Sequence, residues 1–289
     1  MIDLAIAVAC GLGIAVIFKH AAQRGMDRLS LLTANYLTAS LISLAMLDAD
    51  RFIPEAGFVL LCVLTGGLFI SGFFMLALAT SLAGMSLATA IMRISVVIPF
   101  VASWAIWSEV PSAYQFIGLI VGGAAFVLIS SRPAGMRTLT GVDAAREMAH
   151  SRRTMTVLLL LFLIGGLIDT LMKTFDEVFA QVHSRSAFML IVFGTASVIG
   201  LVIVIARRRR PLGATLVWGV VLGLVNIASV EFILRAIRQL SGPFVFPANN
   251  ILLVIGSALL GVFFWKERLT VLNGIGLILA AAALVLLNF

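Results

Sequence analysis

Long apolar runs, separated by short polar loops, make up almost the whole chain. A helix crosses the hydrocarbon core of a bilayer with about 17–25 residues, and ten of the runs are of that length. Because lipid offers backbone groups no hydrogen-bond partner, helices are the economical way to span it. The pattern therefore predicts an all-α polytopic membrane protein with ten transmembrane helices, at residues 2–20, 30–48, 57–80, 85–107, 113–131, 154–173, 187–206, 213–234, 243–264 and 270–288.

The second half of the chain repeats the first. Residues 109–130 align without a gap on residues 267–288, with nine identical residues in 22 positions, among them a glutamate and a glycine. Weaker matches extend to the earlier helices at nearly the same offset. We therefore expect two five-helix repeats, 1–131 and 154–289, joined by a polar linker at 132–153. An odd number of spans inserts the second copy upside down, so the halves are predicted to be inverted repeats.

Composition agrees with the hydrophobic pattern. Of the 289 residues, 62% are hydrophobic and 11% are charged, whereas soluble domains carry roughly 25% charged residues. The net charge of +7 comes mainly from basic residues in the loops, which is typical of an anchor at the membrane surface. We therefore expect no nucleic-acid partner. The chain has no HExxH or GxSxG motif and its two cysteines lack metal-ligand spacing, so we expect no metal, no cofactor and no enzyme activity.

Lysines and arginines are distributed unevenly between the two sets of loops. Fourteen of the twenty follow the first, third, fifth, seventh and ninth spans, and five lie on the opposite side. Loops rich in these residues stay in the cytoplasm. The count therefore predicts a multi-pass protein of the inner (plasma) membrane whose two termini face out.

Both repeats end with a similar motif. In the first, WSE at 107–109 leads through a short turn to Gly118, and in the second, WKERLT at 265–270 leads to Gly276. This arrangement resembles the EamA-type ten-helix exporters of the drug/metabolite transporter (DMT) superfamily. The resemblance implies a central cavity lined by the first, third and fourth helices of each repeat, a peripheral fifth helix, and alternating access without ATP. It also implies that the termini are cytoplasmic, contrary to the charge count.

Arg93 lies near the middle of the span at 85–107. An ionisable group at that depth costs about 2.5–3.5 kcal/mol on insertion scales, so it needs a partner or a function. A guanidinium matches the geometry of a carboxylate, and Arg93 is therefore a candidate for binding an anionic group of a substrate. The alternative is a structural salt bridge to Glu231 or Asp169.

The matching stretch of the second repeat carries two adjacent amides, Asn249 and Asn250. They offer donors and acceptors inside a span, and we expect them to contact substrate or, alternatively, to bond a neighbouring helix. Pro247 precedes them and removes a backbone hydrogen bond, which predicts a helix break or hinge facing the cavity.

Two spans carry an acid and a base at i, i+4. Glu231 is followed by Arg235, and Asp169 by Lys173, which aligns with Lys19 of the first repeat. Such pairs stabilise a helix, and long lysines near helix ends often reach the interface. The functional alternative for Glu231 is a protonatable site that couples proton movement to transport.

Weaker candidates are other polar or aromatic side chains within the spans. For substrate contact these are Asn35, Tyr36, Asn226 and Trp104, and for gating or capping they are Glu109 and Glu267.

These features favour a secondary transporter that exports small polar metabolites, such as amino acids or related compounds, by alternating access. Its partners would be the small-molecule substrate and the lipid bilayer; a monomer is sufficient and a homodimer is compatible. One alternative is a multidrug or organic-cation exporter, although the first helix has no acid beyond Asp3. Another is a flippase of a lipid-linked sugar.

Overall fold

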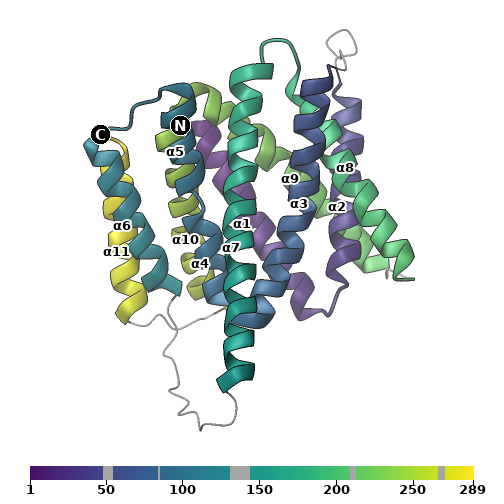
Figure 1. The fold of residues 1–289 in the computed structure, drawn as a ribbon. Coiled ribbons are helices and arrows are strands. Elements are labelled where there is room, and N and C mark those ends of the chain that lie inside the picture. Colours follow the sequence, from purple (N-terminus) through teal and green to yellow (C-terminus); the bar gives the residue numbers. More distant parts are fainter. Residues whose placement is uncertain (48–54, 84, 131–143, 209–212, 266–270) are drawn as a thin grey trace. The chain divides into compact units, whose positions relative to one another are not determined.

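The computed structural model describes residues 1–47, 55–83, 85–130, 144–208, 213–265 and 271–289 (Figure 1). In this part the chain is almost entirely helical and has no β-strand, which confirms the all-α class. The helices are α1 (Ile2–Gln23), α2 (Arg28–Ala45), α3 (Ala56–Ala83), α4 (Met85–Ile94), α5 (Val97–Trp107), α6 (Ala113–Ser130), α7 (Ala144–Thr174), the π-helical η2 (Phe175–Phe179), α8 (Arg185–Ala206), α9 (Gly213–Gln239), α10 (Gly242–Trp265) and α11 (Val271–Leu287).

Within the described residues, six helices are long and apolar enough to cross a membrane, and shorter apolar helices accompany them. The observed helices follow the predicted spans closely, most of them to within a few residues at each end. The chain is therefore a multi-pass membrane protein. The arrangement of ten spans as inverted repeats stays a prediction.

The polar stretch predicted as a linker is partly helical. Residues 131–143 lie outside the described residues, but α7 already begins at Ala144, before the predicted span at 154. The stretch 144–153, AAREMAHSRR, is polar yet rich in alanine, arginine, glutamate and methionine, which are strong helix formers. Polarity therefore marks where the apolar span begins and not where the helix begins.

The span predicted at 85–107 is interrupted, with α4 and α5 on either side of Ser95–Val96. Pro99 lacks the N–H that would bond the Ser95 carbonyl, and that carbonyl accepts from Ile98 N–H at 2.9 Å instead. The Ser95 hydroxyl donates to the Met92 carbonyl at 2.7 Å. The prediction of one continuous helix was therefore wrong here, and Pro99 was the signal for the interruption.

The chain forms two compact units, and each takes helices from both halves of the sequence. Unit 1 consists of Met1–Ile70 and Thr170–Val245, and in it α9 packs against α1 and α2, while α2 also packs against α8. Unit 2 consists of Ser71–Asp169 and Phe246–Phe289, and in it α6 packs against α11 and α4. Each unit therefore mixes the two predicted repeats.

In unit 1, α2 and α8 hold equivalent places in the two predicted repeats and lie side by side (Figure 1). The backbone of α8 at Gly194 approaches the Ser40 hydroxyl, and at Gly200 it approaches Thr33. Residue numbers rise along one helix as they fall along the other, so the two helices run antiparallel.

In unit 2, the equivalent pair is α6 and α11 (Figure 1). A Cβ on Gly118 would lie 3.0 Å from Leu287 Cγ, and at the other end Asn273 Nδ2 donates to the Leu128 carbonyl at 3.3 Å. These two helices are also antiparallel. A glycine at position 118 lets their backbones approach closely, as small residues do between membrane helices.

Candidate functional site

In unit 2, polar side chains meet beside the α4–α5 interruption. Arg93 Nη1 donates to Asn250 Oδ1 at 3.0 Å. Asn250 is 6% exposed, and its Nδ2 donates to the Phe246 carbonyl at 3.0 Å. Because this second bond takes the amide NH₂ group, the amide oxygen is the atom that faces the guanidinium. The structure thus joins two residues that the sequence singled out separately.

Arg93 occupies the last turn of α4. Backbone carbonyls at the end of a helix carry partial negative charge, which favours a cation there by about 0.3–1 kcal/mol at an exposed helix end and more where partly buried. The carbonyl groups at the end of α4 therefore partly compensate the positive charge of the Arg93 guanidinium within the span.

Helix α7 also touches the interruption. A Cβ on Gly165 would lie 2.7 Å from Ser95 Oγ, and one on Gly166 would lie 2.5 Å from Ile98 Cβ. Asp169, the other predicted partner of Arg93, lies one turn further along α7. Both residues are among those described, and the ion pairs found there do not include one between them.

Helix α10 continues through Pro247, so the helix break predicted at this residue was wrong. Pro247 lies in the second turn, where the missing N–H costs a single hydrogen bond near the helix start. Asn249 is partly exposed next to buried Asn250. The roles of Asn249 in substrate contact and of Pro247 as a hinge stay predictions.

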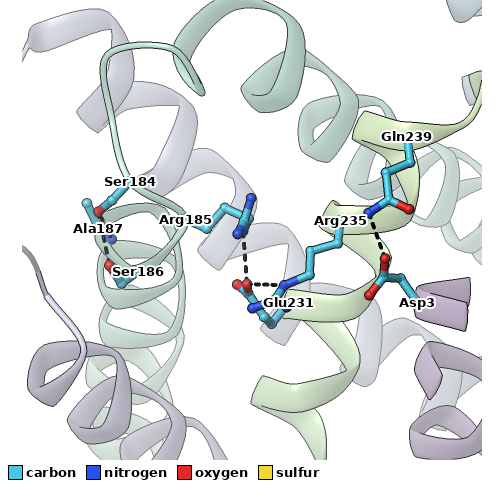
Figure 2. Close-up of polar contacts among 8 residues, drawn as sticks. All are labelled: Asp3, Ser184, Arg185, Ser186, Ala187, Glu231, Arg235 and Gln239. Atoms are coloured by element: carbon cyan, nitrogen blue, oxygen red, sulfur yellow. Dashed lines mark hydrogen bonds and ion pairs between the residues drawn. The ribbon is translucent and has the colours of Figure 1, made fainter.

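In unit 1, Glu231 is the centre of an ionic cluster (Figure 2). Its Oε1 accepts from Arg235 Nε at 2.7 Å and from Arg185 Nε at 3.0 Å. The i, i+4 pair with Arg235 was predicted from the spacing, and it is confirmed. Arg185, the first residue of α8, is a partner that the spacing along one helix does not reveal. The two arginines favour the structural interpretation of Glu231 over proton coupling.

Lys173 is buried, with 1% of its side chain exposed, and its Nζ donates to Glu177 Oε1 at 2.5 Å. The spacing predicted a pair with Asp169, one turn before Lys173, whereas the observed partner lies one turn after it. Lys173 therefore does not reach an exposed position, because the π-helical turn supplies a carboxylate beside it. Figure 2 also shows a hydrogen bond from Gln239 Nε2 to Asp3 Oδ2 at 2.7 Å.

Asn35 and Asn226 join α2 to α9 within unit 1. Asn226 Nδ2 donates to Asn35 Oδ1 at 3.1 Å, and Asn35 is 1% exposed. Tyr36 is also buried and its ring stacks with Phe193 of α8, with centroids 6.1 Å apart. These contacts join α2 to α9 and α8, as polar and aromatic side chains do between membrane helices. Substrate contact by the three residues stays a prediction.

Four further candidates were named from the sequence, namely Trp104, Glu109, Lys19 and Glu267. Trp104 is well exposed and its ring meets Phe116 edge-on. Glu109 follows the left-handed Ser108 at the end of α5, and its N–H donates to the Ser103 carbonyl at 3.2 Å. Lys19 lies near the end of α1. Glu267 lies outside the described residues.

His183 is a buried histidine that was not singled out from the sequence. His183 is 2% exposed, and its ring stacks on Phe58 at 4.0 Å. Its Nε2 lies 3.5 Å from Glu55 Oε2. It lies between the π-helical turn and α8, and only the tertiary packing shows that it is enclosed.

The chain is similar to known proteins along its whole length. Residues 1–131 match the EamA-like transporter family. An uncharacterized protein of Haemophilus influenzae is 24% identical, over 100% of this chain and 98% of the relative. A protein crystal structure has the same fold, with a TM-score of 0.75 at 16% identity, over 99% of this chain and 98% of that one.

Proposed function

We propose that this protein, whose residues 1–131 match the EamA-like transporter family, is a secondary transporter of the drug/metabolite transporter superfamily that moves small polar metabolites. It moves amino acids or related compounds across the inner membrane by alternating access, in the direction of export. Its cytoplasmic loops are those that carry most of the lysines and arginines.

The observation that carries this proposal is the bond between Arg93 and Asn250. A guanidinium has five N–H donors, and Asn250 accepts from one of its nitrogens. A substrate carboxylate can accept from the remaining donors in a bidentate pair, which a fixed guanidinium favours. The positive charge of Arg93 also makes an organic-cation exporter less well supported, because like charges repel in a site of low dielectric constant.

The packing within each unit supports a pair of inverted repeats. Equivalent helices run antiparallel, α2 beside α8 in one unit and α6 beside α11 in the other. Tyr36 stacks on Phe193, and Arg93 bonds Asn250, which is 157 positions further on. Both pairs join positions separated by nearly the repeat length, as expected near a two-fold axis in the membrane plane.

The test is transport in proteoliposomes with a panel of labelled amino acids and organic acids. We expect wild-type flux for at least one compound and its loss in Arg93→Gln. The matched control is Arg207→Gln, because Arg207 is exposed just after α8. Both variants are checked for a single folded species by size-exclusion chromatography. Undiminished flux in folded Arg93→Gln would remove Arg93 from the mechanism, and no wild-type flux for any compound would overturn the proposed function.

A further inference from the structure

The two arginines that bond Glu231 leave most of their hydrogen-bond donors unused (Figure 2). Arg185 Nε and Arg235 Nε donate to the same atom, Glu231 Oε1, at 3.0 and 2.7 Å. A guanidinium has five N–H donors, four of them on its two Nη atoms. Because the two Nε atoms share one acceptor, the two guanidinium groups lie next to one another. Neither uses its Nη atoms in the hydrogen bonds found among the described residues.

Both guanidinium groups are held in place and remain accessible. The guanidinium of Arg235 lies over the ring of Phe232, with its Cζ 5.2 Å from the ring centroid. The side chains of Arg185 and Arg235 are 29% and 42% exposed, whereas that of Glu231 is 13% exposed. The carboxylate is therefore the enclosed member of the cluster, and the two guanidinium groups are the members that a further anion can reach.

The charges around the cluster leave it positive. Glu231 compensates one of its two arginines. Lys173 and Glu177 compensate each other, and Asp176 of the π-helical turn has its opposite in Arg238 near the end of α9. One positive charge therefore remains in excess around Glu231, and an anion beside the two guanidinium groups would neutralise it.

The cluster lies at the end of a helix that is longer than the hydrocarbon core of a bilayer. Helix α9 has 27 residues and is about 40 Å long at about 1.5 Å of rise per residue, against a core of about 30 Å. All its charged residues lie in its last third, which begins at Glu231. Arg185 is the first residue of α8. The guanidinium groups are therefore expected at the level of the lipid headgroups, where phosphate is the abundant anion.

The first repeat has no equivalent of this cluster. Arg28 begins α2 as Arg185 begins α8. The acid and the base of α9, however, have no counterpart, because the matching positions hold Phe73 and Ala77. The scaffold common to both repeats therefore forms without the cluster, which favours a role in binding over a role in the fold alone.

We propose that Arg185 and Arg235 form a binding site for a phosphate group, which their Nη atoms hold while the Glu231 carboxylate holds the two Nε atoms. The phosphate belongs to an anionic lipid headgroup or is a free phosphate ion. It has enough oxygens to accept from two guanidinium forks, whereas a carboxylate satisfies one. Glu231 is the positioning residue, since it keeps the two arginines together. The site lies in unit 1 and is independent of the proposed transport function, whose Arg93 lies in unit 2.

The test is thermal unfolding of the purified protein in detergent, because a ligand that binds only the folded state stabilises it. One probe is inorganic phosphate, compared with sodium chloride of equal ionic strength. The other is phosphatidylglycerol added to the micelles, compared with phosphatidylcholine. We expect at least one probe to raise the unfolding temperature more than its control does. A response to phosphatidylglycerol alone identifies a lipid headgroup as the ligand, and a response to inorganic phosphate shows that the phosphate group is sufficient.

Two single variants locate the site. Arg185→Gln and Arg235→Gln each remove one guanidinium fork and leave Glu231 paired with the other arginine, so the fold is expected to persist. In each we expect the stabilising probe to bind about 10- to 100-fold more weakly, the effect of losing hydrogen bonds to a charged group. Arg28→Gln is the matched control, because Arg28 is exposed at the start of the equivalent helix, and it is expected to bind like wild type.

Three results would overturn the site. The first is an equal unfolding temperature of wild-type protein with each probe and its control, which needs no variant. The second is wild-type affinity in both glutamine variants, because the arginines then serve the fold alone. The third is an equal loss of affinity in Arg28→Gln, because binding then follows the total positive charge. Should the glutamine variants not fold, Arg235→Lys decides, since it keeps the charge but not the fork; wild-type affinity there would also overturn the site.

Discussion

Glu231 accepts hydrogen bonds from two guanidinium groups through a single oxygen, and its side chain is 13% exposed. Arg185 comes from the first turn of α8 and Arg235 from α9, so this carboxylate ties two helices together (Figure 2). The stability of this cluster depends on the Glu231 carboxylate, because without it the guanidinium groups of Arg185 and Arg235 would lie near one another with no counter-charge.

We predict that Glu231→Gln lowers the thermal stability of the purified protein. The amide keeps the shape and one acceptor but loses the charge that both arginines use, at a cost of about 1–3 kcal/mol. The measurement is the unfolding temperature in detergent. The double variant Glu231→Gln with Arg185→Gln is the companion, and it should recover part of the loss because it removes one of the uncompensated cations. An unfolding temperature equal to that of wild type would show that the cluster contributes nothing to stability.

At the scale of the helices, α7 packs tightly against the α4–α5 interruption beside the candidate site. Gly166 fits there because a Cβ would meet both the Cβ and the side-chain end of Ile98. The Cβ of Ile98 cannot move away without its backbone. The position of α7, and with it that of Asp169, therefore depends on the absence of a side chain at position 166.

We predict that Gly166→Ala destabilises the protein by about 1–3 kcal/mol, the usual cost of overpacking. Gly123→Ala is the matched control, because Gly123 lies within α6 and has no other atom within 4 Å of its built Cβ. That change should be neutral or slightly stabilising, since alanine favours a helix over glycine by roughly 1 kcal/mol. The two unfolding temperatures are compared side by side, and equal values would contradict the tight contact.

The helices themselves could be predicted from the sequence, and their irregularities in part. The length of each apolar run located the spans, because the free energy of transfer to lipid adds up over the residues of the run. Two prolines illustrate the limit. Pro99 follows an interruption and Pro247 lies in an unbroken helix. Proline removes one hydrogen bond in either place, and whether the helix breaks depends on the neighbours that satisfy the freed carbonyl.

At the scale of the whole molecule, the antiparallel pairing of equivalent helices leads to a prediction about sidedness. Gln23 ends α1, the first helix of the first repeat, and Gln181 follows the π-helical turn that continues α7, the first helix of the second repeat. Neither is buried. In an inverted repeat the ends of these two equivalent helices, and with them Gln23 and Gln181, lie on opposite sides of the membrane.

The measurement is labelling of Gln23→Cys and Gln181→Cys by a membrane-impermeant maleimide, each in a background with Cys10 and Cys62 changed to alanine. From the charge count we expect Gln181→Cys to be labelled from outside and Gln23→Cys only after the membrane is opened. The reverse result would keep the inverted repeat and place the termini in the cytoplasm. Labelling of both from the same side would contradict the repeat itself.

The sequence by itself determined that this is a membrane protein, where its spans lie, and which few charged residues need an explanation. These follow from local properties, namely apolar length, the cost of charge in lipid and residue spacing along one helix. Only the tertiary structure decided the partners: Asn250 for Arg93, Arg185 for Glu231, and Glu177 for Lys173. Most of these contacts join segments far apart in the chain, and the one within a single segment depends on a π-helical turn. Periodicity says which face a side chain occupies but not which neighbour that face will meet.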